Sequence, residues 1–316
     1  MGTILVGTAS WTDKTLIACG KFYPRGCSSA EGRLRYYADH FPIVEVDSSY
    51  YALPSVANAG LWIARTPDDF RFNIKAFRLF TGHQTPAAAL PRDIQSALAS
   101  HFAASAVLYY RDTPREIRDE LWRRYEQAIA VLHNGKRLGA VLFQFAPWVK
   151  ASRSACDHIL ECRERLARYM LAVEFRHRSW FDAGRREATL AFEREHRLVN
   201  VTVDEPQGPS NSIPAVWDTT HPQLAILRLH GRNLATWNLR EATVASDRFN
   251  YDYSEQELEA FLPSLNDLAA QVFQVHVIFN NNYEDQGQRN AGTLMRLVGG
   301  VHRKIRVDDD ARDAPS

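Results

Sequence analysis

Eight short apolar runs, rich in β-branched and aromatic residues, alternate along this chain with amphipathic helical patterns. Strands that alternate with helices form parallel βαβ units, and eight such units are typical of a closed (β/α)8 barrel. No run leads into a GxGxxG or GxxxxGK[ST] loop, which disfavours the competing open, doubly wound sheet with a nucleotide site. We therefore predict an α/β fold with a closed TIM-like barrel, whose strands are residues 4–9, 43–50, 70–77, 138–145, 170–176, 198–204, 224–230 and 272–280.

Two helical patterns between these runs are the clearest. Apolar residues at helical spacing predict a helix over 115–133. A second helix is expected from Ser254, because Glu257 three residues later completes a capping box. Pro263 is expected to kink that second helix.

Three connections are too long for simple turns, and each leaves the carboxyl end of a predicted strand. They follow the third, sixth and seventh strands, at residues 78–114, 205–223 and 231–253. Long loops at this end of a barrel carry binding and catalytic groups. The chain shows no internal linker, so we predict one barrel domain over 1–306 and a disordered acidic tail over 307–316.

Composition excludes several classes of protein. The net charge is +1, which provides no global field toward nucleic acid or anionic lipid. The longest uncharged apolar stretch, 139–149, is shorter than the roughly 18 residues of a spanning helix. Cysteines 19, 27, 156 and 162 match neither a CxxC motif nor a zinc pattern. We expect a cytoplasmic protein with no membrane partner, no metal and no cofactor.

The two-residue period of the strands places polar side chains inside the barrel. Apolar residues such as Val44 and Val46 would face the helices, which turns Glu45 and Asp47 inward. Barrel interiors usually hold branched apolar side chains, and a buried ion must be paired. The polar set is therefore either a salt-bridge lattice or a site, and its position at strand carboxyl ends favours a site. Its members are Glu45, Asp47, Ser49, Asn73, Lys75, Gln144, Glu174, Arg176, Asn200, Thr202, Asp204, Arg228, His230, His276 and Asn280.

A series of motifs resembles the DUF72 (YecE-like) proteins over about residues 4–300. The resemblance implies a (β/α)8 barrel but no activity, because that family is one of unknown function. Its motifs contain many of the inward residues obtained from strand parity. They read Val6-Gly7-Thr8-Ala9-Ser10-Trp11, Val44-Glu45-Val46-Asp47-Ser48-Ser49-Tyr50-Tyr51, Phe70-Arg71-Phe72-Asn73-Ile74-Lys75-Ala76, Leu142-Phe143-Gln144-Phe145, Glu174-Phe175-Arg176-His177, Leu227-Arg228-Leu229-His230-Gly231-Arg232 and Phe279-Asn280-Asn281.

These residues predict a barrel enzyme of hydrolase, lyase or isomerase type, acting on a small anionic or polyhydroxylated, sugar-like substrate. Cationic side chains would bind phosphate or carboxylate, and carboxylates with a histidine would move protons. The candidate catalytic residues are Glu45, Glu174, Asp204 and His230. The candidate substrate-binding residues are Asp47, Lys75, Gln144, Arg176, Arg228, Asn280, Trp11, Tyr50 and Trp180. Other aromatic residues at strand ends or in the following loops are Tyr51, Trp237, Tyr251 and Tyr253.

Two alternatives stay open. One is a divalent-metal phosphodiesterase or endonuclease-like hydrolase acting on nucleic acid. It is not favoured, because His230 is the one well-placed inward histidine and catalytic zinc sites prefer several. The other is a non-catalytic module that binds a metabolite at the same mouth.

Overall fold

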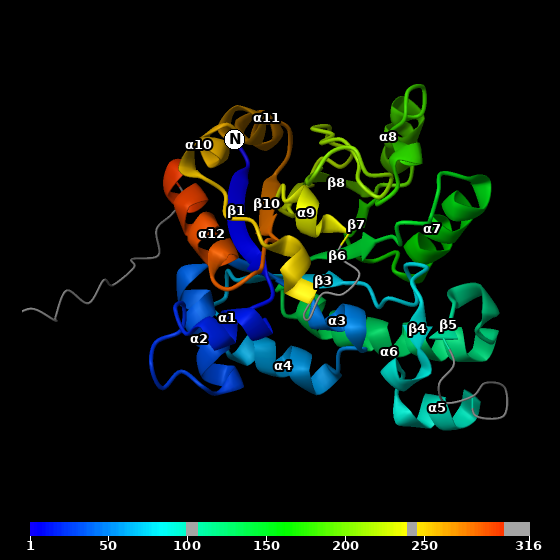
Figure 1. Ribbon diagram of the computed structural model, residues 1–316. Coiled ribbons are helices and arrows are strands. Elements are labelled where there is room, and N and C mark those ends of the chain that lie inside the picture. Colours follow the sequence, from blue (N-terminus) through cyan, green and yellow to red (C-terminus); the bar gives the residue numbers. More distant parts are fainter. Residues whose placement is uncertain (99–106, 239–244, 300–316) are drawn as a thin grey trace, which may run out of the picture.

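Eight parallel strands close on themselves, and helices surround them on the outside (Figure 1). The computed structural model describes residues 1–98, 107–238 and 245–299. Within these residues the barrel order is β1-β10-β9-β8-β7-β6-β3-β2, which confirms the predicted closed (β/α)8 fold. The strands are β1 (Thr3–Ala9), β2 (Ile43–Val46), β3 (Arg71–Lys75), β6 (Leu138–Gln144), β7 (Leu171–Glu174), β8 (Val199–Asp204), β9 (Leu224–Leu229) and β10 (Gln274–Phe279).

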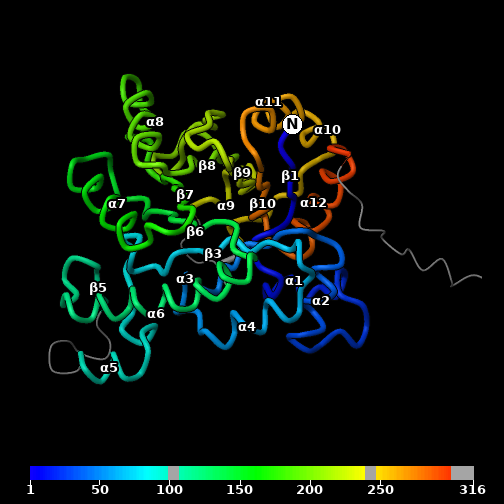
Figure 2. The backbone as a smooth tube through the Cα atoms, turned by 180° about the vertical axis from the view of Figure 1, so that it is seen from behind, coloured from blue at the N-terminus to red at the C-terminus, as the bar shows by residue number. Residues whose placement is uncertain are grey.

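Amphipathic helices cover the outer face of the barrel, as views from opposite sides show (Figures 1 and 2). The predicted helix 115–133 is confirmed one residue longer, as α6 (Arg115–Asn134), and it buries Leu121, Tyr125, Ile129 and Leu132. The others that flank the strands are α1 (Lys14–Cys19), α2 (Ala30–His40), α3 (Ser48–Tyr51), α4 (Val56–Ala64), α7 (Arg153–Arg165), α8 (Arg186–Glu195) and α12 (Gln286–Leu297).

The helix expected from Ser254 is two helices. Its capping box with Glu257 is present at the start of α10 (Glu255–Glu259), and α11 (Leu262–Gln271) follows with Pro263 in its first turn. A proline ring clashes with the carbonyl four residues earlier and offers no N–H. The chain therefore stops one helix at Glu259 and starts another, instead of kinking a continuous one.

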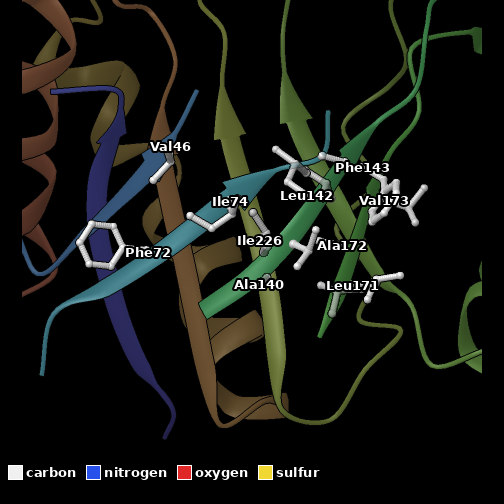
Figure 3. Close-up of a cluster of buried hydrophobic side chains, with 14 of the residues drawn as sticks. Val46, Phe72, Ile74, Ala140, Leu142, Phe143, Leu171, Ala172, Val173 and Ile226 are labelled. Atoms are coloured by element: carbon white, nitrogen blue, oxygen red, sulfur yellow. The ribbon is translucent and has the colours of Figure 1, made fainter. Parts of the chain in front are cut away.

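The core lies between the strands and the helices. Phe72, Ile74, Phe143 and Val173 belong to this layer (Figure 3). Inside the barrel a second, small apolar cluster contains Ala9, Ile43 and Ile278, and in the strand register Ala9 pairs with Glu45 and Ile278 with Arg228. Apolar and polar side chains therefore share the barrel interior at this level.

The three long connections are confirmed. The loop after β3 carries an antiparallel pair, β4 (Thr85–Pro86) with β5 (Val107–Leu108), and α5 (Arg92–Leu98), at one edge of the molecule (Figure 1). The loop after β9 carries α9 (Leu234–Trp237) and a 3-10 turn, η4 (Ala245–Phe249). Residues 205–223, after β8, form neither helix nor strand. The predicted tail 307–316 and the last residues of the predicted domain lie outside the described residues.

Two glycines provide a matched test of barrel closure. A Cβ at Gly7, in β1, would lie 2.0 Å from the backbone oxygen of Ile43 on the neighbouring strand, whereas one at Gly60, in α4, meets nothing within 4 Å. We expect Gly7→Ala to lower the free energy of unfolding by about 1–3 kcal/mol. Gly60→Ala is expected to raise it by up to about 1 kcal/mol, because alanine favours a helix. Urea unfolding of both variants checks this, and equal effects would contradict the strand spacing.

Candidate functional site

The strands end earlier than the apolar runs suggest, and this sets the depth of each polar side chain. β2 stops at Val46 and the chain enters α3, while β7 stops at Glu174. Asp47, Tyr50 and Arg176 therefore stand just beyond the strand ends, at the rim, and Glu174 lies one layer deeper. The polar set forms a floor and a rim at the carboxyl end of the barrel.

The floor is built around one guanidinium, that of Arg228, whose side chain is fully buried. Its Nε and Nη2 donate to the two carboxylate oxygens of Glu45 at 3.0 and 2.6 Å. Its Nη1 donates to Glu174, and Nη2 also reaches Oδ1 of Asn280 at 3.3 Å. Residues from β2, β7 and β9 and from the end of β10 are thereby joined across the barrel. This is the salt-bridge lattice that the inward pattern offered as one alternative.

Glu174 accepts four hydrogen bonds. Besides Arg228, its donors are Gln144 Nε2 at 2.6 Å, His230 Nε2 at 3.1 Å and Arg176 Nη1 at 3.3 Å, all to Oε1. Burial alone would raise the pKa of Glu174, but the attraction of Arg228 and the other donors outweighs burial and holds the pKa well below its usual range. Glu174 is therefore a fixed negative charge with no open face.

Glu45 shares Arg228 but has fewer stabilising partners. Burial raises its pKa against the attraction of Arg228 and Lys75. The two carboxyl groups on one guanidinium thus differ in proton affinity, because desolvation acts on both while the cations favour Glu174. All four of their carboxylate oxygens accept hydrogen bonds, so neither group presents a free oxygen to a ligand.

His230 is held as a neutral ring. Burial lowers its pKa to about 3 despite the attraction of Glu174. The amide of Asn280 accepts from Arg228, so its Nδ2 donates to His230 Nδ1 at 2.9 Å, and the ring proton lies on Nε2 toward Glu174. Both ring nitrogens are occupied, which leaves His230 no open position for shuttling a proton.

The rim carries a second set of cations. Lys75 Nζ donates to Asp47 at 2.8 Å and lies 4.9 Å from the ring centre of Tyr50. Arg78, which sequence reasoning missed, lies over the same ring at 5.3 Å. Its Nε is buried without a hydrogen-bond partner. An arginine in a predicted loop gives no signal by spacing, so this residue required the structure.

The predicted inward orientation of Asp204 is wrong. In the register of β8 and β9, Val203 pairs with Arg228 and Asp204 pairs with Leu229, so the valine shares the inner face and Asp204 the outer one. Asp204 instead accepts from Arg232 at 2.9 Å and from the hydroxyl of Tyr253 at 2.7 Å.

The connection that follows β8 explains why its polar residues face outward and its valines inward. Because residues 205–223 form no helix, part of this segment covers the outer face of β8 with its backbone. Thr202 Oγ1 donates to the carbonyl of Val216 at 2.7 Å, and Asn200 Nδ2 donates to the same oxygen at 3.2 Å. Polar side chains on that face find backbone partners that a packed helix could not supply.

Because the inner and outer faces of β8 are exchanged relative to the prediction, Glu205 turns inward. Sequence reasoning missed Glu205 because it was assigned to a loop. The side chain is 2% exposed, its Oε1 accepts from the backbone N–H of Ile213 at 2.8 Å, and its Oε2 has no hydrogen-bond partner. Arg176 Nη2 stands 3.7 Å from Oε2. Burial raises the pKa of Glu205 to about 7 against that attraction. Glu205 also lines a hollow of about 520 Å³, together with Asp204, Arg232 and Leu234.

Arg176 connects the floor to Glu205. Its guanidinium bridges Glu174 and Glu205 and lies 4.8 Å from the ring centre of Trp237. Its Nε and the indole Nε1 of Trp237 are both buried without a hydrogen-bond partner. Two donors and one carboxyl oxygen thus remain unsatisfied around one guanidinium, an arrangement that folded proteins rarely leave without a ligand or water.

Two predicted aromatic binding residues lie in the core. Trp180 stacks on Phe175 at 3.9 Å and donates its indole N–H to the carbonyl of Val149. Trp11 is 8% exposed and meets Trp62 edge to face at 6.0 Å. Their faces are covered by neighbouring side chains, so the structure brings Tyr50, but not Trp11 or Trp180, to the cationic rim.

The described residues contain neither a metal-binding cluster nor a membrane-spanning helix. No group of three or more histidine, cysteine, aspartate or glutamate side chains within 1–98, 107–238 and 245–299 is arranged to hold a metal ion. Among the same residues, no helix is long and apolar enough to cross a membrane. His276, predicted inward, lies deep in the barrel on Asn73 and Gln274, away from the mouth.

Comparisons with known proteins agree on one group of relatives. The profile of the family described as "Protein of unknown function DUF72" matches residues 5–315. The UPF0759 protein YunF of Bacillus subtilis (strain 168) is 32% identical over 302 residues, covering 93% of this chain and 94% of that protein. A DUF72 family structure from Enterococcus faecalis V583 matches with TM-score 0.75 and 26% identity, covering 94% and 96% of the two chains. One from Thermotoga maritima MSB8 matches with TM-score 0.73 and 29% identity, covering 94% and 99%.

Removing the central guanidinium tests the floor. Arg228→Met leaves Glu45 and Glu174 buried without their shared cation, and we expect a loss of about 3–5 kcal/mol in the free energy of unfolding. Arg123→Met, which breaks an exposed pair with Glu120 on α6, is the control and is expected to change stability far less. Urea unfolding at neutral pH measures both, and similar losses would show that the lattice is not a special contributor.

Glu205 predicts a pH dependence of stability. Because its folded pKa of about 7 lies above the ordinary value of 4.5, the folded protein holds the proton more tightly. This contribution to stability is complete below about pH 4.5 and is lost as pH rises through 7, up to about 3 kcal/mol. Glu205→Gln removes that slope, so the variant gains stability relative to the parent between pH 5 and 8. Glu195→Gln, at an exposed position, is the control and should keep the pH dependence of the parent protein. If the stability of Glu205→Gln followed the same pH dependence as that of the parent, this titration would be excluded.

Proposed function

The chain belongs to the DUF72 family, which is of unknown function, and from that premise we propose that it is an enzyme acting on a small anionic or sugar-like substrate. The substrate binds at the carboxyl end of the barrel. The observation that carries the proposal is the set of unsatisfied polar atoms around Arg176: its own Nε, the indole Nε1 of Trp237 and Oε2 of Glu205. A bound oxyanion and hydroxyl would satisfy them together.

Charge at the mouth supports an anion. The cationic side chains are those of Lys75, Arg78, Arg176 and Arg228, and the facing carboxyls are those of Glu45, Asp47, Glu174 and Glu205. Burial raises the pKa of Glu205 to about 7, so this carboxyl is partly neutralised near neutral pH. Near neutral pH the balance is therefore positive, and Arg176 with Arg78 offers fork-shaped donors suited to phosphate or carboxylate.

Proton transfer is assigned to Glu205 within this proposal. A general acid or base works best with a pKa near the working pH, and Glu205 combines a pKa of about 7 with an oxygen that has no partner. The predicted roles of Glu45, Glu174 and His230 become positioning roles. Their hydrogen bonds hold Arg228 and Arg176 in place beneath the ligand.

Binding of ribose 5-phosphate and of inorganic phosphate to the purified protein tests the anion site by calorimetry. Arg176→Gln removes the charged fork, and we expect at least a tenfold loss of affinity for both probes, as for a charge-assisted hydrogen bond of about 1.5–3 kcal/mol. Arg178→Gln, an exposed arginine two residues along the same loop, is the matched control and should bind like the parent protein.

Two results would overturn the proposed site. The first is the absence of binding to the parent protein by either probe. The second is an equal loss of affinity in Arg176→Gln and Arg178→Gln, which would indicate nonspecific attraction to surface charge. Circular dichroism of each variant verifies that the barrel remains folded.

A further inference from the structure

A row of four aromatic rings lies along one side of the mouth: Tyr51, Tyr50, His83 and Trp148. The ring centres are 5.0 Å apart from Tyr51 to Tyr50, 5.2 Å from Tyr50 to His83 and 5.7 Å from His83 to Trp148. The rings come from α3, from the loop after β3 and from the loop after β6. Three separate segments therefore converge on one aromatic row.

The two ends of the aromatic row are exposed. Tyr51 is 47% exposed and Trp148 is 52% exposed. Trp148 is nevertheless held in place, because its indole N–H donates to the carbonyl of Gly82 at 3.1 Å. The loop that carries it is tied to the same turn by the bond from the backbone N–H of Ala146 to the carbonyl of Thr81, at 3.0 Å. A large apolar ring is thus presented to solvent in a fixed orientation instead of being buried.

The aromatic row adjoins the cationic rim. Lys75 and Arg78 both lie over the ring of Tyr50, at 4.9 and 5.3 Å. Burial lowers the pKa of His83 to about 3, and the charges of Lys75, Arg78 and Arg176 contribute to that shift. These cations are therefore close to His83, and His83 is an uncharged ring at neutral pH. Neighbouring rings meet edge to face, at interplanar angles of 90°, 87° and 69°, so the stacking face is that of an exposed end ring such as Trp148, with positive charge at the other rings.

We propose that the aromatic row is a stacking subsite for a planar ring carried by the same ligand whose anionic group binds at Arg176. The ligand class is a phosphorylated compound with an aromatic heterocycle, such as a nucleoside monophosphate. This inference rests on the proposed function, because it takes the anion site as the anchor. It adds the chemical identity of the rest of the ligand.

A heterocycle fits the aromatic row better than a second sugar unit does. Sugar recognition requires hydrogen-bond partners for several hydroxyl groups, and the polar groups next to Tyr50 are already paired or purely cationic: Asp47 accepts from Lys75, and His83 Nδ1 is bonded to Thr81. A π-face stacks on an aromatic side chain without needing such partners. The exposed ring face of Trp148 therefore selects for planarity and leaves the polar recognition to Arg176, Trp237 and Glu205.

Calorimetry with two probes that differ by one group tests the subsite. Adenosine 5′-monophosphate and ribose 5-phosphate share the sugar and the phosphate, and only the first carries a base. We expect the nucleotide to bind the parent protein about 5- to 100-fold more tightly. Trp148→Ala is expected to remove most of that ratio and to leave the affinity for ribose 5-phosphate unchanged. Phe273→Ala removes an exposed ring beside the amino end of β10, so it is the matched control and should keep the ratio.

Each outcome discriminates between the two proposals. Equal affinity for the two probes overturns the stacking subsite and leaves the anion site standing. A ratio that survives in Trp148→Ala also overturns it, because the base would then lie elsewhere. Failure of the parent protein to bind either probe overturns both proposals. Loss of the ratio in Trp148→Ala alone, with ribose 5-phosphate binding intact, supports the stacking subsite.

Discussion

The guanidinium of Arg228 is fully buried inside the barrel, and it joins Glu45, Glu174 and Asn280 from across the barrel. A buried charge of this kind is tolerated only when its partners are held in matching geometry. The parallel strands supply that geometry, because their carboxyl ends meet at one rim. The floor of the mouth, its charge balance and the position of Arg176 all depend on this lattice.

Atoms that the lattice leaves unsatisfied are more informative than those it satisfies. The polar atoms of Glu45, Glu174 and His230 all have hydrogen-bond partners, so these side chains are fixed in position. Around Arg176, by contrast, the Nε atom, the Trp237 indole and one Glu205 oxygen have no partner. Side chains with all polar atoms paired and side chains with unpaired ones are thus separated along the barrel axis.

Strand parity predicted the floor correctly and failed at one strand. Glu45, Lys75, Gln144 and Arg228 alternate with apolar residues that pack against helices, so their inward direction follows from the pattern alone. In β8 the polar residues, including Asp204, face outward and the valines inward, because backbone carbonyls of the following segment cover the outer face of the strand. A pattern of polar and apolar residues does not say which face is covered by backbone.

The sequence by itself determined the closed barrel, the places of its three long loops and the inward direction of most polar strand residues. These follow from local periodicity, which each strand carries independently of its neighbours. Only the tertiary structure decided that Glu205, and not Asp204, turns toward Arg176, and that Trp148 and His83 extend Tyr50 into an aromatic row. It also decided the proton affinities of Glu45 and Glu205. Burial and neighbouring charge arise between segments distant in sequence, and no local pattern records them.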